Sequence, residues 1–195
     1  MLPGNIQRHR AVLIYTPMNN FDKNWRNAKK NIFRLEGRPE YKVASEQEDI
    51  ANWKKGELNL GANKEWQKWM ELLKSAKTRG VVTQRVRVAP TPLPDYIKFE
   101  IDSWQKYSVK NGDKIFFLDK NDYQEIITAY GFNAKDFWLF DDQHLLIFNY
   151  DKSGQFAGEI LIEDGGMARR YSEMKAKLLQ KATPLETFVK KMKSA

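Results

Sequence analysis

Bulky residues recur at helical spacing along much of the chain, most clearly between residues 64 and 79. A period of about 3.6 residues places them on one stripe there, and Gly80 follows as a typical helix C-terminus. The stripe consists of Trp66, Trp69, Met70, Leu73 and Ala76. Similar spacing predicts helices over residues 22–33, 45–55, 95–107, 123–130 and 167–181, with a final turn or two over 185–193.

The helix over residues 45–55 starts with the spacing of a capping box. The Ser45 hydroxyl can accept a hydrogen bond from the amide of Glu48, whose carboxylate can bond back to Ser45. Acidic residues in this first turn also favour the positive end of the helix dipole. We therefore expect the helix to begin at Ser45 and to end near Gly56.

Alternating residues between positions 81 and 88 predict a β-strand with two chemically different faces. One face carries Val82, Gln84, Val86 and Val88. The other face carries Val81, Thr83, Arg85 and Arg87. Further strands are predicted over residues 32–36, 115–118, 137–140, 144–150 and 156–162.

The order of these elements predicts a mixed α/β (α+β) fold. The last three strands are separated by short polar turns, so they predict an antiparallel meander at the C-terminal end of one mixed sheet, flanked by helices. We expect one domain over residues 20–182, an N-terminal extension over 1–19 and a basic C-terminal tail over 183–195.

The formal net charge of +8 is unevenly distributed along the chain. Residues 91–166 carry 7 basic and 14 acidic side chains, whereas residues 167–195 carry 8 basic and 2 acidic ones. A basic helix can bind nucleic acid through phosphate contacts, although lysine-rich helices commonly serve only to keep a surface solvated. The candidates for such contacts are Arg169, Arg170, Lys175, Lys177 and Lys181.

Composition and motifs exclude several kinds of chemistry. The sequence has no cysteine and only two histidines, which argues against disulfides, thiolate nucleophiles and zinc sites. It has no phosphate-binding loop, no G-x-S-x-G elbow and no H-E-x-x-H motif. We therefore assign no catalytic residue and expect no cofactor or metal. Apolar runs are also far shorter than the ~20 residues of a membrane span, so we expect a cytoplasmic protein with no membrane partner.

Arginines on the predicted strands are the best candidates for a site. Arg34 and Glu36 flank Leu35, and Arg85 and Arg87 share a strand face. If these arginines point inward, each needs a carboxylate partner or an anionic ligand, because an unpaired buried charge is costly. The acidic residues available include Glu36, Glu46, Glu100, Asp141 and Asp142. An ion-pair network and a pocket for a small phosphate or carboxylate both satisfy this requirement.

Several short segments resemble an uncharacterised bacterial family that is common in actinobacteria and is classed as a domain of unknown function. The resemblance covers about residues 20–180 and rests on segments 33–36, 79–88, 94–100, 136–142 and 150–158. Members of that family are often encoded beside helix-turn-helix regulators. The resemblance implies a regulatory or sensing accessory that binds such a protein, and it identifies no catalytic residue.

A more distant likeness is to the phospholipase D-like fold, whose catalytic motif is H-x-K-x-x-x-x-D. If Asp141 is placed at the aspartate of that motif, Ala134 stands at the histidine and Asp136 at the lysine. The residues for phosphodiester cleavage are then missing. The resemblance therefore implies a degenerate, binding version of that fold.

These observations leave three functional hypotheses in order. The first is a non-enzymatic regulatory module that binds a protein partner and a small anionic ligand. The ligand site predicted for it comprises Arg34, Glu36, Arg85, Arg87, Tyr96, Glu100, Asp141 and Asp142. The second is nucleic-acid binding through the basic C-terminal helix, and the third is a phosphodiesterase-like enzyme.

Overall fold

The computed structural model describes residues 19–131 and 136–194, and within them the chain forms one seven-stranded sheet. The strands are β1 (Asn31–Glu36), β2 (Val82–Ala89), β3 (Asp113–Asp119), β4 (Asp136–Phe140), β5 (His144–Tyr150), β6 (Phe156–Ile162) and β7 (Thr183–Pro184). They lie in the order β6-β5-β4-β1-β2-β3-β7. Most of the expected N-terminal extension, residues 1–18, lies outside the described residues.

The sheet is mixed because its two halves are connected differently. β1, β2 and β3 pair in parallel, and the chain passes through helices between them. β4, β5 and β6 pair antiparallel through short turns, β4 pairs antiparallel with β1, and β7 pairs antiparallel with β3. The predicted fold class, including the C-terminal meander, is thereby confirmed.

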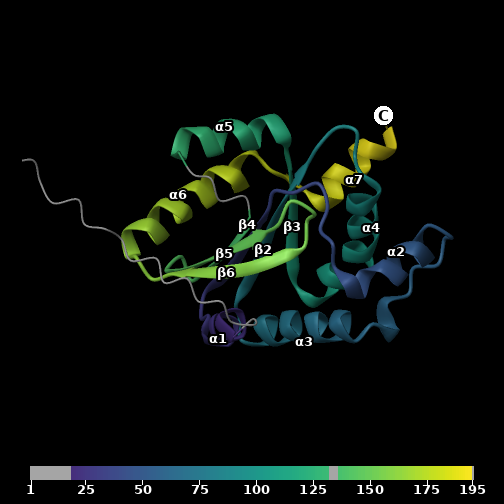
Figure 1. The fold of residues 1–195 in the computed structure, drawn as a ribbon, viewed down its shortest axis with the longest axis horizontal. Helices are drawn as coiled ribbons and strands as arrows, with labels where there is room; N and C mark the ends of the chain where they lie inside the picture. The colour runs from purple at the N-terminus through teal and green to yellow at the C-terminus, as the bar shows by residue number, and fades with distance from the viewer. Residues whose placement is uncertain (1–18, 132–135, 195) are drawn as a thin grey trace, which may run out of the picture.

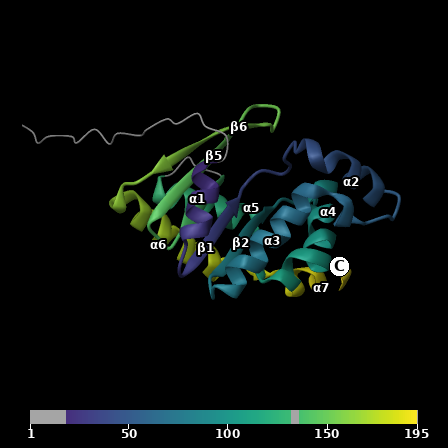
Figure 2. The same ribbon diagram turned by 90° about the horizontal axis from the view of Figure 1, so that it is seen from below.

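Helices cover both faces of the sheet (Figure 1). They are α1 (Asn19–Asn27), α2 (Gln47–Trp53), α3 (Lys64–Thr78), α4 (Asp95–Ser103), α5 (Lys120–Tyr130), α6 (Gly165–Lys181) and α7 (Leu185–Ser194). α5 and α6 lie on one face, and α1 and α3 lie on the other, as the view from below also shows (Figure 2). None of the helices in the described part of the chain has the length and apolar composition that crossing a bilayer requires.

The two sheet faces differ in chemistry because side chains alternate along each strand. Phe33, Leu35, Val86 and Val88 form an apolar core with α5 and α6. The intervening residues point to the opposite face, where Ile32 contacts a cluster that also contains α1 and α3 residues. Arg34, Glu36, Arg85 and Arg87 occupy this second face, and the helices covering it bury them.

The predicted capping box at Ser45 is wrong. Ala44–Glu46 form a single 3-10 turn, and α2 begins at Gln47 without a side-chain cap. The local groups have tertiary partners instead. The Ser45 carbonyl accepts a hydrogen bond from Asn63, and Glu46 accepts one from the Tyr96 hydroxyl. Long-range contacts have therefore overridden a local capping preference.

Residues 183–194, expected to be part of a basic tail, form β7 and α7. Leu185 and Val189 are buried in the core at the β3 end of the sheet. The Phe188 ring stacks on Phe117 with the centroids 4.2 Å apart. The lysines of this segment lie on the opposite side of an amphipathic helix, so its basic composition is compatible with a packed element.

Candidate functional site

A cavity of about 450 Å³ lies on the second sheet face. It is lined by residues of β1, β2, β4 and β5, of α1, α3 and α4, of the turn after α4 and of the segment before α2. This volume is within the range of small-molecule sites in proteins. Its aromatic lining includes Phe21, Trp66, Trp69, Trp104, Trp138 and Phe148. Its polar lining includes Arg34, Glu36, Glu46, Arg85, Tyr96 and Glu100.

Arg85 is held from two strands at the bottom of this cavity. Its Nη1 lies 2.7 Å from Oε1 of Glu36 on β1, and its Nε lies 3.3 Å from Oδ2 of Asp113 on β3. All three side chains are buried. Parallel pairing of β1, β2 and β3 brings these residues together although they are far apart in sequence.

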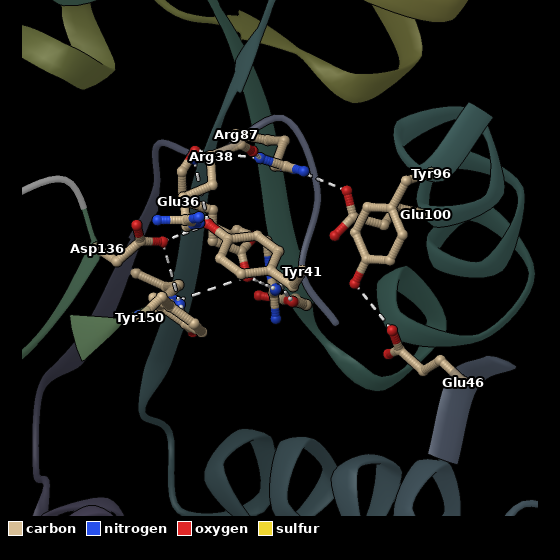
Figure 3. Close-up of polar contacts among 12 residues, drawn as sticks. Glu36, Arg38, Tyr41, Glu46, Arg87, Tyr96, Glu100, Asp136 and Tyr150 are labelled. Carbon is tan, nitrogen blue, oxygen red and sulfur yellow. Dashed lines mark hydrogen bonds and ion pairs between the residues drawn. The ribbon is translucent and has the colours of Figure 1, made fainter. Parts of the chain in front are cut away.

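Arg87 lies deeper and is fully buried, with 0% of its surface exposed. Its Nε donates to Oε2 of Glu100 at 2.7 Å, and its other nitrogens donate to the backbone carbonyls of Arg38 and Pro39 (Figure 3). The guanidinium thus ties α4 and the chain after β1 to the sheet. Such a fully engaged cation has a structural role and is not among the residues lining the cavity.

Arg34 forms the opposite end of the network. Its Nη2 lies 3.5 Å from Oδ1 of Asp136 and donates to the hydroxyl of Tyr150 at 3.2 Å. The Tyr41 hydroxyl donates to the same Asp136 oxygen (Figure 3). Antiparallel pairing places Glu36 opposite Asp136 and Arg34 opposite Trp138, which explains how β4 supplies this partner.

Aromatic rings fix the planes of both cavity guanidiniums. The centre of the Arg34 guanidinium lies 5.1 Å from the Trp138 centroid and 4.9 Å from that of Phe148. Arg85 is placed similarly against Trp69 and Trp104, at 5.4 and 5.1 Å. Cation–π contacts of this kind stabilise a desolvated guanidinium and restrict its orientation.

Some polar atoms at the cavity have no hydrogen-bond partner among the described residues, although they are buried. Nη1 and Nε of Arg34 are two such donors, and Nε1 of Trp66 and Nε1 of Trp138 are two more. Oε2 of Glu36 is an acceptor in the same situation. Unsatisfied buried polar atoms are rare in proteins and commonly indicate the place of a ligand or of water.

Burial and the arginines shift the pKa values of the carboxyl groups in opposite directions. Burial raises the pKa of Asp113 and of Asp136 although each contacts an arginine. Burial also opposes ionisation of Glu36, but the charges of Arg85, Arg34 and Arg87 outweigh it and lower the pKa of Glu36. Glu36 is therefore the carboxylate that is most firmly ionised in this network.

Burial raises the pKa of Glu100 to about 8 in spite of its contact with Arg87. Glu46 is a second carboxyl group of this region that titrates near neutral pH. Burial raises its pKa from 4.5 to about 7, and the hydrogen bond from Tyr96 and the charge of Arg85 only partly oppose the shift. Negative charge on Glu36 and Asp49 raises it further. Near neutral pH, small changes in the surroundings of Glu46 therefore change whether its carboxyl group is protonated.

The raised pKa of Glu46 predicts a pH dependence of stability. The folded protein binds this proton more tightly than the unfolded chain, so the contribution is complete below pH 4.5 and is lost as the pH rises through about 7. Allowing for partial exposure, we expect the loss between pH 5 and pH 8 to be about 2 kcal/mol. Urea denaturation should show that Glu46→Gln lacks this component, and equal pH profiles for the two proteins would contradict it.

The structure brings together six of the eight residues predicted for the site and places the other two elsewhere. Arg34, Glu36, Arg85, Arg87, Tyr96 and Glu100 belong to the cavity or to the network below it. Asp141 and Asp142 lie in the β4–β5 turn. Asp141 accepts hydrogen bonds from the amides of Lys29, Lys30 and Asn31, and Asp142 pairs with Lys175 at 2.6 Å.

Sequence reasoning missed four polar members of the network: Tyr41, Asp113, Asp136 and Tyr150. Two of them carried a usable signal. Asp113 and Asp136 are the first residues of β3 and β4, one or two positions before the predicted starts of these strands. Alternation along each strand places both side chains on the polar face. Extending the predicted strands by one or two residues would have included both.

The basic residues of α6 are largely engaged with the protein itself. Lys181 pairs with Asp122 and Glu125 of α5, and Lys175 pairs with Asp142. Arg170 donates to the carbonyl of Tyr130. Arg169 and Lys177 are exposed. These contacts attach α6 to α5 and to the β4–β5 turn.

Comparison with protein families matches residues 19–190 to the model of a domain of unknown function (DUF6879). No curated protein matches the sequence. The family match covers the whole sheet, all seven helices of the described residues up to Lys190, and every residue of the cavity and its network.

Proposed function

This chain belongs to the family of the domain of unknown function DUF6879, and from that premise we propose that it is a non-enzymatic sensing module. It binds a small molecule with an anionic group in the cavity, and occupancy of the cavity controls a protein partner. The resemblance to companions of helix-turn-helix regulators suggests such a regulator as the partner.

The proposal depends mainly on one observation, the incomplete hydrogen bonding of the buried Arg34 guanidinium. The side chain is only 3% exposed and lines the cavity. Its Nη1 has no hydrogen bond among the described residues, and its Nε has only a 3.5 Å ion-pair contact with Oε1 of Glu36. A purely structural ion pair would be expected to satisfy these donors, because each unsatisfied buried donor costs about 1–3 kcal/mol. An anionic ligand group would satisfy two of them at once.

The lining is suited to binding and offers little for catalysis. None of the described lining residues is a histidine or a cysteine, and His144 is exposed on β5, away from the cavity lining. Arg85 and Arg34 are held rigidly by aromatic rings, and Glu36 is neutralised by both. A pre-organised, aromatic-walled pocket recognises a ligand well, and the near-neutral carboxyl group of Glu46 has no histidine or cysteine beside it among the described lining residues.

A ligand bound in the cavity can also affect the molecular surface. Its walls include α1, α3 and the segment around Val43–Glu46, which have exposed outer sides. A ligand that orders these elements would stabilise one arrangement of that surface. A partner that prefers this arrangement would then bind more tightly in its presence, as thermodynamic linkage requires.

Binding of aromatic anions tests the proposal directly. We expect 3-phenylpropanoate and phenyl phosphate to change tryptophan fluorescence at millimolar concentration, because four tryptophans line the cavity. Arg34→Met should weaken this binding at least about tenfold through loss of a charge-assisted hydrogen bond. Arg34→Lys should restore only part of it, because lysine lacks the planar fork.

Arg26→Met provides the matched control, because Arg26 is exposed on α1. It should bind both anions like the unaltered protein. Circular dichroism must show that each variant is folded. If folded Arg34→Met bound the anions as tightly as the control variant, the proposed site would be wrong.

A further inference from the structure

The cavity and the network beneath it contain more carboxyl groups than guanidiniums. The lining includes the exposed residues Asp22, Glu65 and Lys68, of which Glu65 and Lys68 pair with each other. Among the buried and half-buried residues, three arginines, Arg34, Arg85 and Arg87, face five acidic residues. These are Glu36, Glu46, Glu100, Asp113 and Asp136. Four of the five have an arginine nitrogen within 3.5 Å. Glu46 is the member of this set without such a contact.

Glu46 is held toward the cavity by a single described hydrogen bond. The Tyr96 hydroxyl donates to its Oε2 at 2.8 Å (Figure 3). A tyrosine hydroxyl supplies no positive charge, so the ionised form of Glu46 has no counter-ion among the described residues. The carboxyl group is only partly exposed, which limits how well water can compensate.

Glu36 supplies a second acceptor to the same cavity. Its Oε1 contacts Arg85 and Arg34, whereas its Oε2 is buried without a hydrogen-bond partner among the described residues. Glu36 is 7% exposed and lines the cavity. The residues lining the cavity therefore include donors of Arg34 and an acceptor of Glu36 that lack hydrogen bonds among the described residues, and also Glu46, for which no ion pair is found there.

We infer that the ligand carries a cationic ammonium or guanidinium group, bound by Glu36 and Glu46, in addition to the anionic group bound by Arg34. The ligand class is therefore a small zwitterion with an apolar body, which the aromatic walls would contact. This inference rests on the proposed function, because it concerns the other end of the same ligand.

Charge favours a cation at this end over a neutral hydrogen-bond donor. The groups that act on Glu46 come from every neighbouring element: Glu36 on β1, Arg85 on β2, Asp49 on α2, and Tyr96 and Glu100 on α4. Three of them are acidic groups that raise one another's pKa or that of Glu46. A bound cation would relieve this repulsion, whereas a neutral donor would not.

A cation at Glu46 must also affect its proton. The pKa of Glu46 is about 7, so part of the protein carries this proton at pH 6.5. A ligand cation favours the ionised carboxylate and displaces the proton. Binding of the cationic group should therefore release protons and strengthen as the pH rises from 6 to 8.

Three probes of similar shape separate the two ends of the site. They are L-phenylalanine, which is zwitterionic, 3-phenylpropanoate, which has only the anionic group, and 2-phenylethylamine, which has only the cationic group. In calorimetric titrations at pH 7.5, we expect L-phenylalanine to bind about tenfold more tightly than either single-charge probe, as an added charge-assisted hydrogen bond predicts.

Glu46→Gln should remove this advantage while leaving the anion end intact. We expect about a tenfold loss for L-phenylalanine and 2-phenylethylamine and no change for 3-phenylpropanoate. Glu48→Gln is the matched control, because Glu48 is exposed in the first turn of α2. Titration at pH 6.5 in two buffers of different ionisation enthalpy should show proton release for the ammonium probes with the unaltered protein and with Glu48→Gln, but not with Glu46→Gln.

The possible outcomes distinguish the two proposals. If 3-phenylpropanoate binds in an Arg34-dependent manner but L-phenylalanine binds no more tightly, the cation site is wrong and the proposed function stands. If Glu46→Gln and Glu48→Gln behave alike toward the ammonium probes, the cation site is also wrong. If none of the three probes binds at 10 mM, both the cation site and the proposed function are contradicted.

Discussion

Replacing Arg87 with alanine is expected to lower the free energy of unfolding by about 4 kcal/mol, the cost typical of breaking a buried ion pair. Arg87 is fully buried, and its Nε contacts Glu100 at 2.7 Å. The substitution leaves Glu100 buried without its counter-ion. It also removes the donors for the carbonyls of Arg38 and Pro39, which hold the chain after β1 against the sheet.

A second variant separates the cost of the orphaned charge from that of lost packing. In Arg87→Met combined with Glu100→Leu, neither charged member of this ion pair remains, and we expect about 2 kcal/mol of the loss to be recovered. The carbonyls of Arg38 and Pro39 remain without their donor, so recovery should be incomplete. Urea denaturation followed by circular dichroism measures all three proteins. Equal stability of Arg87→Ala and the double variant would contradict the role assigned to the charge.

Trp25→Ala is expected to destabilise the protein by a similar amount, about 4 kcal/mol. Trp25 is 1% exposed and joins α1 to α3 and to the sheet. Its ring centroid lies 5.1 Å from that of Trp69 and 5.8 Å from that of Trp138. Its indole nitrogen donates to the carbonyl of Leu72 at 3.2 Å. The truncation therefore creates a cavity and removes a hydrogen bond between α1 and α3.

Lys23→Ala is the control for this prediction, because Lys23 is exposed on the same helix and alanine favours helix formation. It should change stability by less than about 0.5 kcal/mol. Since α1 also contributes Phe21 to the cavity wall, Trp25→Ala should weaken binding of 3-phenylpropanoate even under conditions where the protein is folded. Normal binding by a destabilised variant would show that α1 does not shape the site.

The helical and the strand periods of the hydrophobic pattern identified most of the elements correctly. The stripe over residues 64–79 forms α3, and Trp66, Leu73 and Ala76 are buried as expected. Alternation over residues 81–88 placed Arg85 and Arg87 on the same face, which is how β2 presents them. These predictions succeeded because they depend only on the local geometry of a helix or a strand.

The partners of the arginines could not be identified in the same way. Asp141 and Asp142 were among the available acidic residues, but they lie beyond the C-terminal end of β4, which runs from Asp136 to Phe140. A strand of this length spans about 16 Å, so the acidic residues at its two ends are separated by about that distance along the strand. Antiparallel pairing with β1 places Asp136 opposite Glu36 and leaves the turn acids at the other end.

The sequence by itself determined which side chains share a strand face, where the helices lie and that inward-facing arginines would need negative partners. Only the tertiary structure decided that the charged face of the sheet is covered by α1, α3 and α4 instead of by water. The physical reason is that alternation gives the direction of a side chain but not what lies above it. That depends on contacts between residues distant in sequence, and these contacts turned a charged strand face into a buried network with a cavity.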